Sequence, residues 1–208
     1  MYLQNLSDKI WLTRNARFNA AKRMKRNHIS STAAVALLSA SVIAVNLLAF
    51  VSNVTEYQKT IITIVSVILS TFALVMSLLI ALLRYQWREE NYHLCGMELE
   101  DLNQQIQIHI DELKAKTTNK EKVDSSTEDN LRFQKKYSDI LKKHGLNHTI
   151  FDYKYGSLND ERQRFNKTTR CYLYLRMYFF DVNLLYWAIA IIPIIVIFIL
   201  FITLFIKT

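Results

Sequence analysis

The residues best suited to chemistry are two histidines and an aspartate spaced by four, His144, His148 and Asp152. On an unbroken helix this spacing would place three metal-ligating side chains on one face. Gly145 interrupts the helix between the first two of them, so the spacing does not secure a metal site. We interpret the three as polar surface or capping residues, and the sequence predicts no metal site.

Other catalytic patterns are missing from the sequence. Cys95 and Cys171, the two cysteines, lie far apart in helical patterns, which favours two reduced thiols over a redox pair. The chain contains neither a HExxH nor a GxSxG motif, and its three glycines form no phosphate-binding loop. We therefore predict a protein that is not an enzyme and needs no cofactor. A membrane enzyme would have only His148 and Asp152 as mild catalytic candidates.

Three uncharged apolar runs dominate the chain and must position these polar segments: Ser31–Val51, Thr60–Leu83 and Leu184–Ile206. Each has about 20 residues or more, and a membrane-spanning helix needs roughly 20. Strands and hairpins need turn residues, but the chain has only three glycines and one proline. The sequence therefore predicts an all-α integral membrane protein, with a transmembrane helical hairpin over 31–83 and a third, C-terminal transmembrane helix over 184–206.

Polar helices are expected around these runs. Residues 1–30 predict an amphipathic basic helix, and the segment 84–183 predicts a helical region with a mobile linker at 117–130. Apolar residues in that segment repeat every three or four positions, which calls for a partner face; they are Leu99, Leu102, Ile106, Ile110 and Leu113.

Turn residues predict how the second half of the polar segment is divided. A short helix over about Leu131–His144 should end at Gly145, which suits a C-terminal cap. The sequence NHTIFDYKYG is then expected to be an irregular link. Ser157 opens a plausible capping box, from which a long helix is expected to run into the third apolar run.

The net charge of +8 is unevenly distributed. Residues 1–32 carry seven Lys and Arg against one Asp, whereas residues 84–183 carry seventeen against sixteen Asp and Glu. Basic flanks stay in the cytoplasm, so we predict an inner-membrane protein with a cytoplasmic N-terminus, a cytoplasmic 84–183 region and an outside C-terminus. The expected partner of the basic segment is the lipid bilayer or a protein surface, and direct nucleic-acid binding is not expected.

Polar residues follow one face of each helix in the predicted hairpin. They form either a packing seam between the two helices or the lining of a water-filled path, and both alternatives stay open. Asn46 is the exception, because an amide near the bilayer centre is costly and must find a partner. Since the runs hold no charged residue, a pump or carrier is disfavoured, and a pore from so few spans would need a homo-oligomer. The candidate pore-lining or packing residues are Ser39, Asn46, Thr63, Ser66, Ser70 and Ser77.

Three sequence elements together carry a family resemblance: RNARFNAAKR (Arg14–Arg23), YHLCGMELEDL (Tyr92–Leu102) and NHTIFDY (Asn147–Tyr153). With the membrane hairpin between the first two, the chain resembles the SLATT family of prokaryotic two-transmembrane proteins over most of residues 8–155. The third apolar run departs from this two-span pattern. The residues that match the family motifs are Asn15, Arg17, Phe18, Asn19, Arg23, Asn147, His148, Asp152 and Tyr153.

The resemblance implies a membrane effector of an antiviral or other conflict system, which forms pores that kill or arrest the infected cell (abortive infection). It also implies a separate sensor as partner: a nucleotide-second-messenger synthetase, a nucleotide-binding SLOG module or a reverse transcriptase. The chain looks most similar to the branch associated with reverse transcriptases. The alternative is a non-conducting membrane anchor or scaffold for a cytoplasmic partner.

Overall fold

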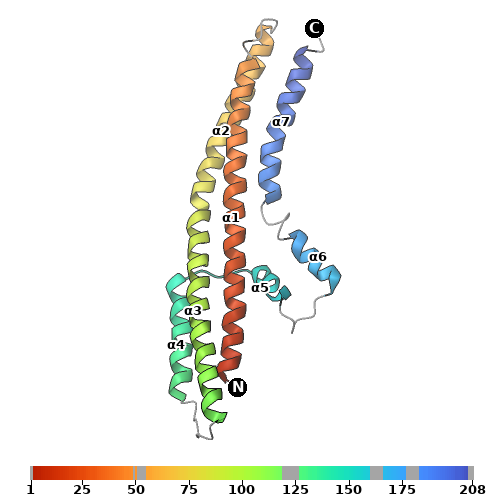
Figure 1. Ribbon diagram of the computed structural model, residues 1–208. Helices are drawn as coiled ribbons and strands as arrows, with labels where there is room; N and C mark the ends of the chain where they lie inside the picture. The colour runs from red at the N-terminus through yellow and green to blue at the C-terminus, as the bar shows by residue number, and fades with distance from the viewer. Residues whose placement is uncertain are drawn as a thin grey trace. The chain divides into compact units, whose positions relative to one another are not determined.

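The computed structural model describes residues 2–48, 50, 55–118, 127–159, 166–176 and 183–205. Every regular element in these ranges is a helix, which confirms the all-α prediction (Figure 1). The elements are α1 (Tyr2–Leu48), α2 (Glu56–Leu83), α3 (Tyr85–Thr118), α4 (Thr127–His144), α5 (Ile150–Gly156), the 3₁₀ helix η1 (Ser157–Asn159), α6 (Lys167–Leu175) and α7 (Asn183–Phe205).

The chain divides into two compact units, each described by itself. The polar unit comprises Met1–Met24 and Gln86–Met177, and the apolar unit comprises Lys25–Tyr85 and Tyr178–Thr208. The predicted linker at 117–130 lies mostly outside the described residues, although α4 already begins at Thr127.

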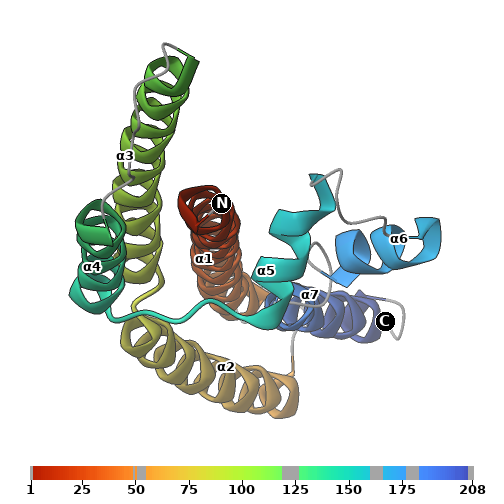
Figure 2. The ribbon, with the colours of Figure 1, turned by 90° about the horizontal axis from the view of Figure 1, so that it is seen from below.

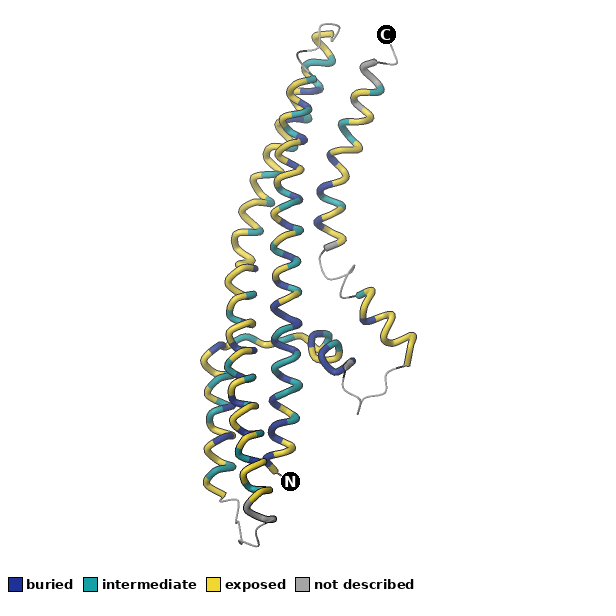
Figure 3. The backbone as a smooth tube through the Cα atoms, in the orientation of Figure 1, coloured by how far each residue is buried: buried dark blue, intermediate teal, exposed yellow. Residues whose placement is uncertain are grey.

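Helix α1 passes through both units without interruption for 47 residues, roughly 70 Å at 1.5 Å per residue. The basic helix expected over 1–30 and the first apolar run are therefore one element. The sequence explains this continuity, because neither Gly nor Pro occurs between Tyr2 and Leu48. Buried residues recur along much of α1, whereas α2 is mostly exposed (Figure 3).

The core of the polar unit lies among α1, α3 and α4. Four of the five periodic apolar residues predicted on α3 enter this core and Leu113 packs against it, because the helix turns one apolar stripe inward. Figure 2 shows the three helices from below, with α3 seen obliquely beside α4. The buried members are Leu3, Leu6, Ile10, Cys95, Leu99, Leu102, Ile106, Ile110, Phe133 and Tyr137.

The end of α4 confirms the predicted cap. Gly145 has φ +58°, and its N–H donates to the carbonyl of Leu141 at 3.2 Å. Only glycine adopts this left-handed conformation at little cost, so the helix ends here.

Two expectations for the following segment are wrong. The predicted irregular link contains α5, because Thr149 and Asp152 form a capping box that starts a helix there. The long helix expected from Ser157 is also interrupted: Asn166 is extended and caps a separate helix, α6. The 3₁₀ helix η1 occupies Ser157–Asn159 instead.

The apolar unit contains the C-terminal part of α1, α2 and α7. By length and composition, the helices containing the first two apolar runs could each cross a membrane, whereas the apolar stretch of α7, Leu184–Ile199, is shorter. A hydrogen bond of 2.8 Å joins the hydroxyls of Tyr85 and Tyr186. Arg84 has φ 47°, the only positive φ of a non-glycine residue in the described chain, and it separates α2 from α3.

Candidate functional site

The most elaborate polar site lies in the polar unit, where α5 packs against α1. Its central residue is Asp152, whose side chain is 2% exposed. Both carboxylate oxygens accept from Arg23, Oδ1 from Nε at 3.1 Å and Oδ2 from Nη2 at 2.9 Å. This is the bidentate geometry in which a planar guanidinium fixes a carboxylate most specifically. We call the Arg23–Asp152 pair with its supporting residues Asn19 and Thr149 the α1–α5 clamp.

The supporting residues of the clamp complete the hydrogen bonding of Asp152. Oδ2 also accepts from the backbone N–H of Thr149 at 2.9 Å and from its hydroxyl at 2.8 Å. The amide of Asn19 donates to the Asp152 carbonyl at 3.4 Å. One carboxylate thus caps α5 and binds it to α1, so the local fold of α5 depends on its docking.

A second arginine holds the chain segment between α4 and α5. Arg17 is 3% exposed; its guanidinium donates to the Leu146 carbonyl and lies 5.7 Å from the ring centre of Tyr92. The Tyr92 hydroxyl in turn donates to the Asn147 carbonyl at 2.7 Å. Arg17 therefore contacts a backbone carbonyl and an aromatic face within the polar unit. The Asn147 side chain itself is exposed.

Close backbone approach explains two glycines. A Cβ on Gly156 would lie 3.2 Å from the Asn15 Cβ and 3.3 Å from the backbone nitrogen of Ala16. On α3, a Cβ on Gly96 would lie 2.7 Å from the ring of Phe18. Both glycines remove a side chain where another helix contacts α1, so α5 and α3 can both approach that helix closely.

The electrostatics of the site favour a fixed structure. Burial first, and then the Arg17 guanidinium, lower the pKa of His148, while the charge of Asp152 opposes this shift. The neutral imidazole stacks on Tyr153 with ring centres 6.1 Å apart. Burial raises the pKa of the Cys95 thiol, so it is a poor nucleophile at neutral pH. These properties of His148 and Cys95 favour a structural role over a catalytic one.

The three residues with metal-ligand spacing have separate partners. Asp152 binds Arg23, His148 stacks on Tyr153, and the Nε2 of His144 lies 3.4 Å from a Glu98 oxygen. Within the described residues, no three His, Cys, Asp or Glu side chains are grouped to hold a metal ion.

The nine motif residues therefore lie around the contact between α1 and the segment that contains α5. Those on α1 lie on the part that α3 and α5 approach, and those of the second motif lie in the segment before α5 or in α5 itself. Sequence reasoning missed Thr149, Tyr92 and the two glycines. The T-x-x-D pattern at Thr149–Asp152 could have revealed the capping box, whereas no pattern in one sequence pairs Tyr92 with a carbonyl 55 residues away.

In the apolar unit, the predicted polar residues divide between two surfaces. Ser66 is 7% exposed and lies on the buried stripe of α2, with Ile62. The hydroxyls of Thr63 and Ser70 donate to carbonyls of their own helix at 2.9 Å. The five candidates other than Ser66 are exposed on this chain: Ser39, Asn46, Thr63, Ser70 and Ser77.

Asn46 differs from the hydroxyl residues in the number of hydrogen bonds that its side chain can make. A serine or threonine in a helix can satisfy its own hydroxyl at the preceding turn. An asparagine amide has two donors and one acceptor oxygen. Among the described residues, Asn46 has no hydrogen-bond partner. Its exposed amide is therefore available to a polar group outside this chain.

Comparison with known families decides the assignment. The model of the SMODS and SLOG-associating 2TM effector domain family 5 matches residues 1–199. The chain belongs to this SLATT family. The match extends well beyond 8–155 and includes most of α7, so the third apolar helix, which departs from a two-span description, lies largely within the family 5 domain. Comparison with curated proteins and with solved structures gives no match.

Membership of this SLATT family supports a membrane effector of a defence system. The two long apolar helices are consistent with a membrane protein. The α1–α5 clamp is then a structural device of the polar unit of such an effector, formed by the residues of its motifs.

Proposed function

We propose that the protein is a pore-forming effector that assembles from several copies and permeabilises the inner membrane when a separate sensor triggers it. The observation that carries this proposal is the exposed, unpartnered amide of Asn46 on a helix that could cross a membrane. In hydrocarbon such a group is costly unless it meets another polar group or water. A second copy or a water-filled path would provide either.

The exposed hydroxyls of α2 agree with this proposal. Thr63, Ser70 and Ser77 lie within about a 40° arc of the helix at 100° per residue. Because their faces are exposed on a single chain, they are available either to a neighbouring copy or to water. The charge-free lining predicts a pore with weak ion selectivity, since fixed rings of charge are what discriminate ions most strongly.

The division of the chain into two units is compatible with separate roles in this proposal. The polar unit would receive the trigger, and α1, which passes into the apolar unit without a break, would connect the two. The family's description names SMODS and SLOG as its associates, which are candidate sensors. A reverse transcriptase stays a predicted alternative, as do a cytoplasmic N-terminus and an outside C-terminus.

The test is leakage of a potential-sensitive dye from proteoliposomes and from induced cells. Ser70→Leu and Thr71→Leu form a matched pair, because both side chains are exposed and both donate to the Val67 carbonyl at 2.9 Å. Thr71 lies about 100° away around the helix. We expect Ser70→Leu to reduce leakage and Thr71→Leu to leave it unchanged.

Asn46→Leu gives a second, independent test. It removes an exposed amide from an apolar face, so insertion into the membrane should improve while leakage is lost. Leu47→Ile, at the next position, which is also exposed, is the control. Leakage that persists in both Asn46→Leu and Ser70→Leu would favour a non-conducting anchor or scaffold instead.

A further inference from the structure

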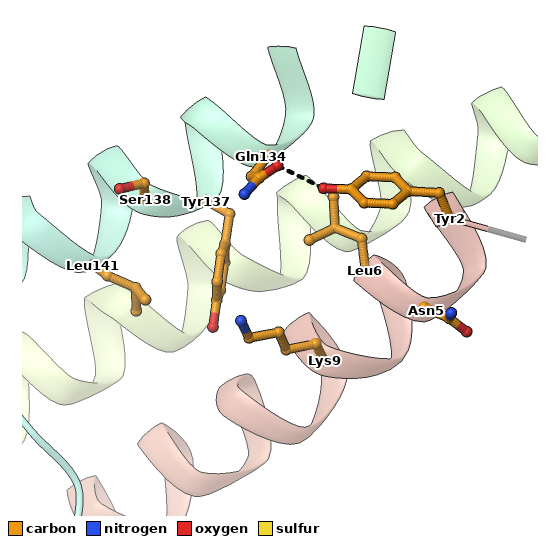
Figure 4. A pocket seen from close by; sticks show the side chains of 8 residues that line it. All are labelled: Tyr2, Asn5, Leu6, Lys9, Gln134, Tyr137, Ser138 and Leu141. Atoms are coloured by element: carbon orange, nitrogen blue, oxygen red, sulfur yellow. Dashed lines mark hydrogen bonds between the residues drawn. The ribbon is translucent and has the colours of Figure 1, made fainter. Parts of the chain in front are cut away.

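A groove in the polar unit lies between the first three turns of α1 and the middle of α4. Its volume is about 410 Å³, within the range of small-molecule sites. The lining residues are Tyr2, Asn5, Leu6, Lys9, Gln134, Tyr137, Ser138 and Leu141 (Figure 4). This groove is separate from the α1–α5 clamp, and none of its residues belongs to the family motifs named above.

The lining has one charge and no countercharge. Lys9 is the single charged residue among the eight, and its ammonium lies 5.5 Å from the ring centre of Tyr137. Within the described residues Lys9 makes no ion pair. An exposed cation above an aromatic ring, with no carboxylate in the lining, favours an anionic ligand over a cationic one.

The remaining lining suits a ligand that also carries a ring. Tyr137 contributes an aromatic face, Leu6 and Leu141 contribute apolar surface, and Asn5 and Ser138 contribute neutral hydrogen-bonding groups. At one end the Tyr2 hydroxyl donates to the Gln134 Oε1 at 2.6 Å, bridging α1 and α4 (Figure 4). The groove thus combines one cation, aromatic and apolar walls and a few polar groups, as ligand sites do.

We propose that this groove binds a small organic anion, a planar ring joined to a phosphate or carboxylate, with the anion at Lys9 and the ring against Tyr137. Because the walls come from two helices, the bound ligand joins the first turns of α1 to α4. α1 continues unbroken into the apolar unit, so occupancy also acts on the helix that carries Asn46. Only this last consequence rests on the proposed function.

The test uses saturation-transfer NMR and calorimetry on the full chain in detergent micelles. The probes are phenyl phosphate and benzoate, with inorganic phosphate and benzyl alcohol as the two halves of the ligand. We expect saturable binding of at least one whole probe and much weaker binding of either half. Lys9→Met should weaken that binding about tenfold, as loss of one charge-assisted hydrogen bond would.

Two further variants separate a local site from a general surface effect. Lys135→Met removes an exposed lysine of α4 that does not line the groove, and it should bind the probe as the wild type does. Ser138→Phe should fill the groove and abolish binding, while amide exchange of the core residues stays unchanged. Absence of saturable binding by both whole probes, or equal affinity in Lys9→Met, would overturn the proposal. Binding without any leakage activity would leave the site intact and count against the proposed pore alone.

Discussion

Breaking the α1–α5 clamp is expected to release α5 while leaving the rest of the polar unit folded. Asp152→Asn keeps the shape of the side chain but removes its charge, so Arg23 is left with no carboxylate in the clamp. The two side chains are 2% and 14% exposed, so this pair is shielded from water. Removing one partner of a buried ion pair costs about 3–5 kcal/mol, chiefly because the other charge stays buried.

The expected loss is local, because α5 has only seven residues and Asp152 also caps it. At the lower figure of about 3 kcal/mol, protection of α5 amides from hydrogen exchange should fall by roughly a hundredfold. Amides of the core at Leu99 and Ile106 should keep their protection. Hydrogen exchange followed by mass spectrometry, on the full chain in micelles, measures both regions in one experiment.

A double-mutant cycle identifies the ion pair as the cause. Arg23→Met should cost about as much as Asp152→Asn, and the double variant should cost clearly less than their sum, since both single variants already remove the same ion pair. Lys22→Met changes an exposed neighbour and should alter stability by no more than about 0.5 kcal/mol. Unchanged exchange of α5 in Asp152→Asn, or strictly additive effects, would refute the clamp.

Three further predictions follow from single residues. Gly145→Ala should cost about 1 kcal/mol in urea unfolding, because φ is +58° and the added Cβ meets nothing nearer than 4.0 Å, so the cost is conformational; Gly145→Asn should cost less, and equal stability of all three would contradict this. The Nζ of Lys143 lies 2.5 Å from a Glu98 oxygen, and this hydrogen bond lowers the pKa of the Glu98 carboxyl. Burial raises the same pKa, but by less, so the pKa is lowered overall. The stabilisation is therefore complete above the ordinary pKa of about 4.3 and is lost as pH falls through the lower folded pKa. Lys143→Met should flatten acid unfolding in that range, and Lys142→Met should not. In detergent micelles, a membrane-impermeant maleimide should label exposed Cys171 but not Cys95, which is 0% exposed with a raised pKa. In spheroplasts with intact membranes the same reagent should label neither cysteine, and labelling of Cys171 from outside would contradict the predicted cytoplasmic position.

The helices and their apolar faces could be predicted from sequence because they depend on residues close together in the chain. The periodicity of Leu99–Leu113 and of Leu3–Ile10 follows from 3.6 residues per turn, and all these residues enter the core or pack against it. Gly145 carries its own turn preference, so the end of α4 was also predictable. Two arginines of the basic segment RNARFNAAKR, Arg17 and Arg23, contact other parts of the polar unit.

Partners far apart in sequence could not be predicted. Arg23 and Asp152 are 129 residues apart, and the sequence around either residue does not indicate that the other is its partner. The continuity of α1 was missed because the composition changes from basic to apolar near residue 30, whereas the helical backbone continues through this point. α5 was missed because seven residues show too little periodicity, and its start depends on Thr149 and Asp152 acting together.

The central proposal, a pore lined by the polar face of the hairpin, is tested most directly by cysteine substitution in planar bilayers. With Cys171→Ser as background, Asn46→Cys and Ser70→Cys should produce channels that a hydrophilic, charged methanethiosulfonate reagent blocks. Leu47→Cys and Thr71→Cys, on the adjacent faces, should conduct equally before and after the reagent. Block confined to the first pair is the predicted result. Block of neither pair, or of both pairs alike, would contradict the account.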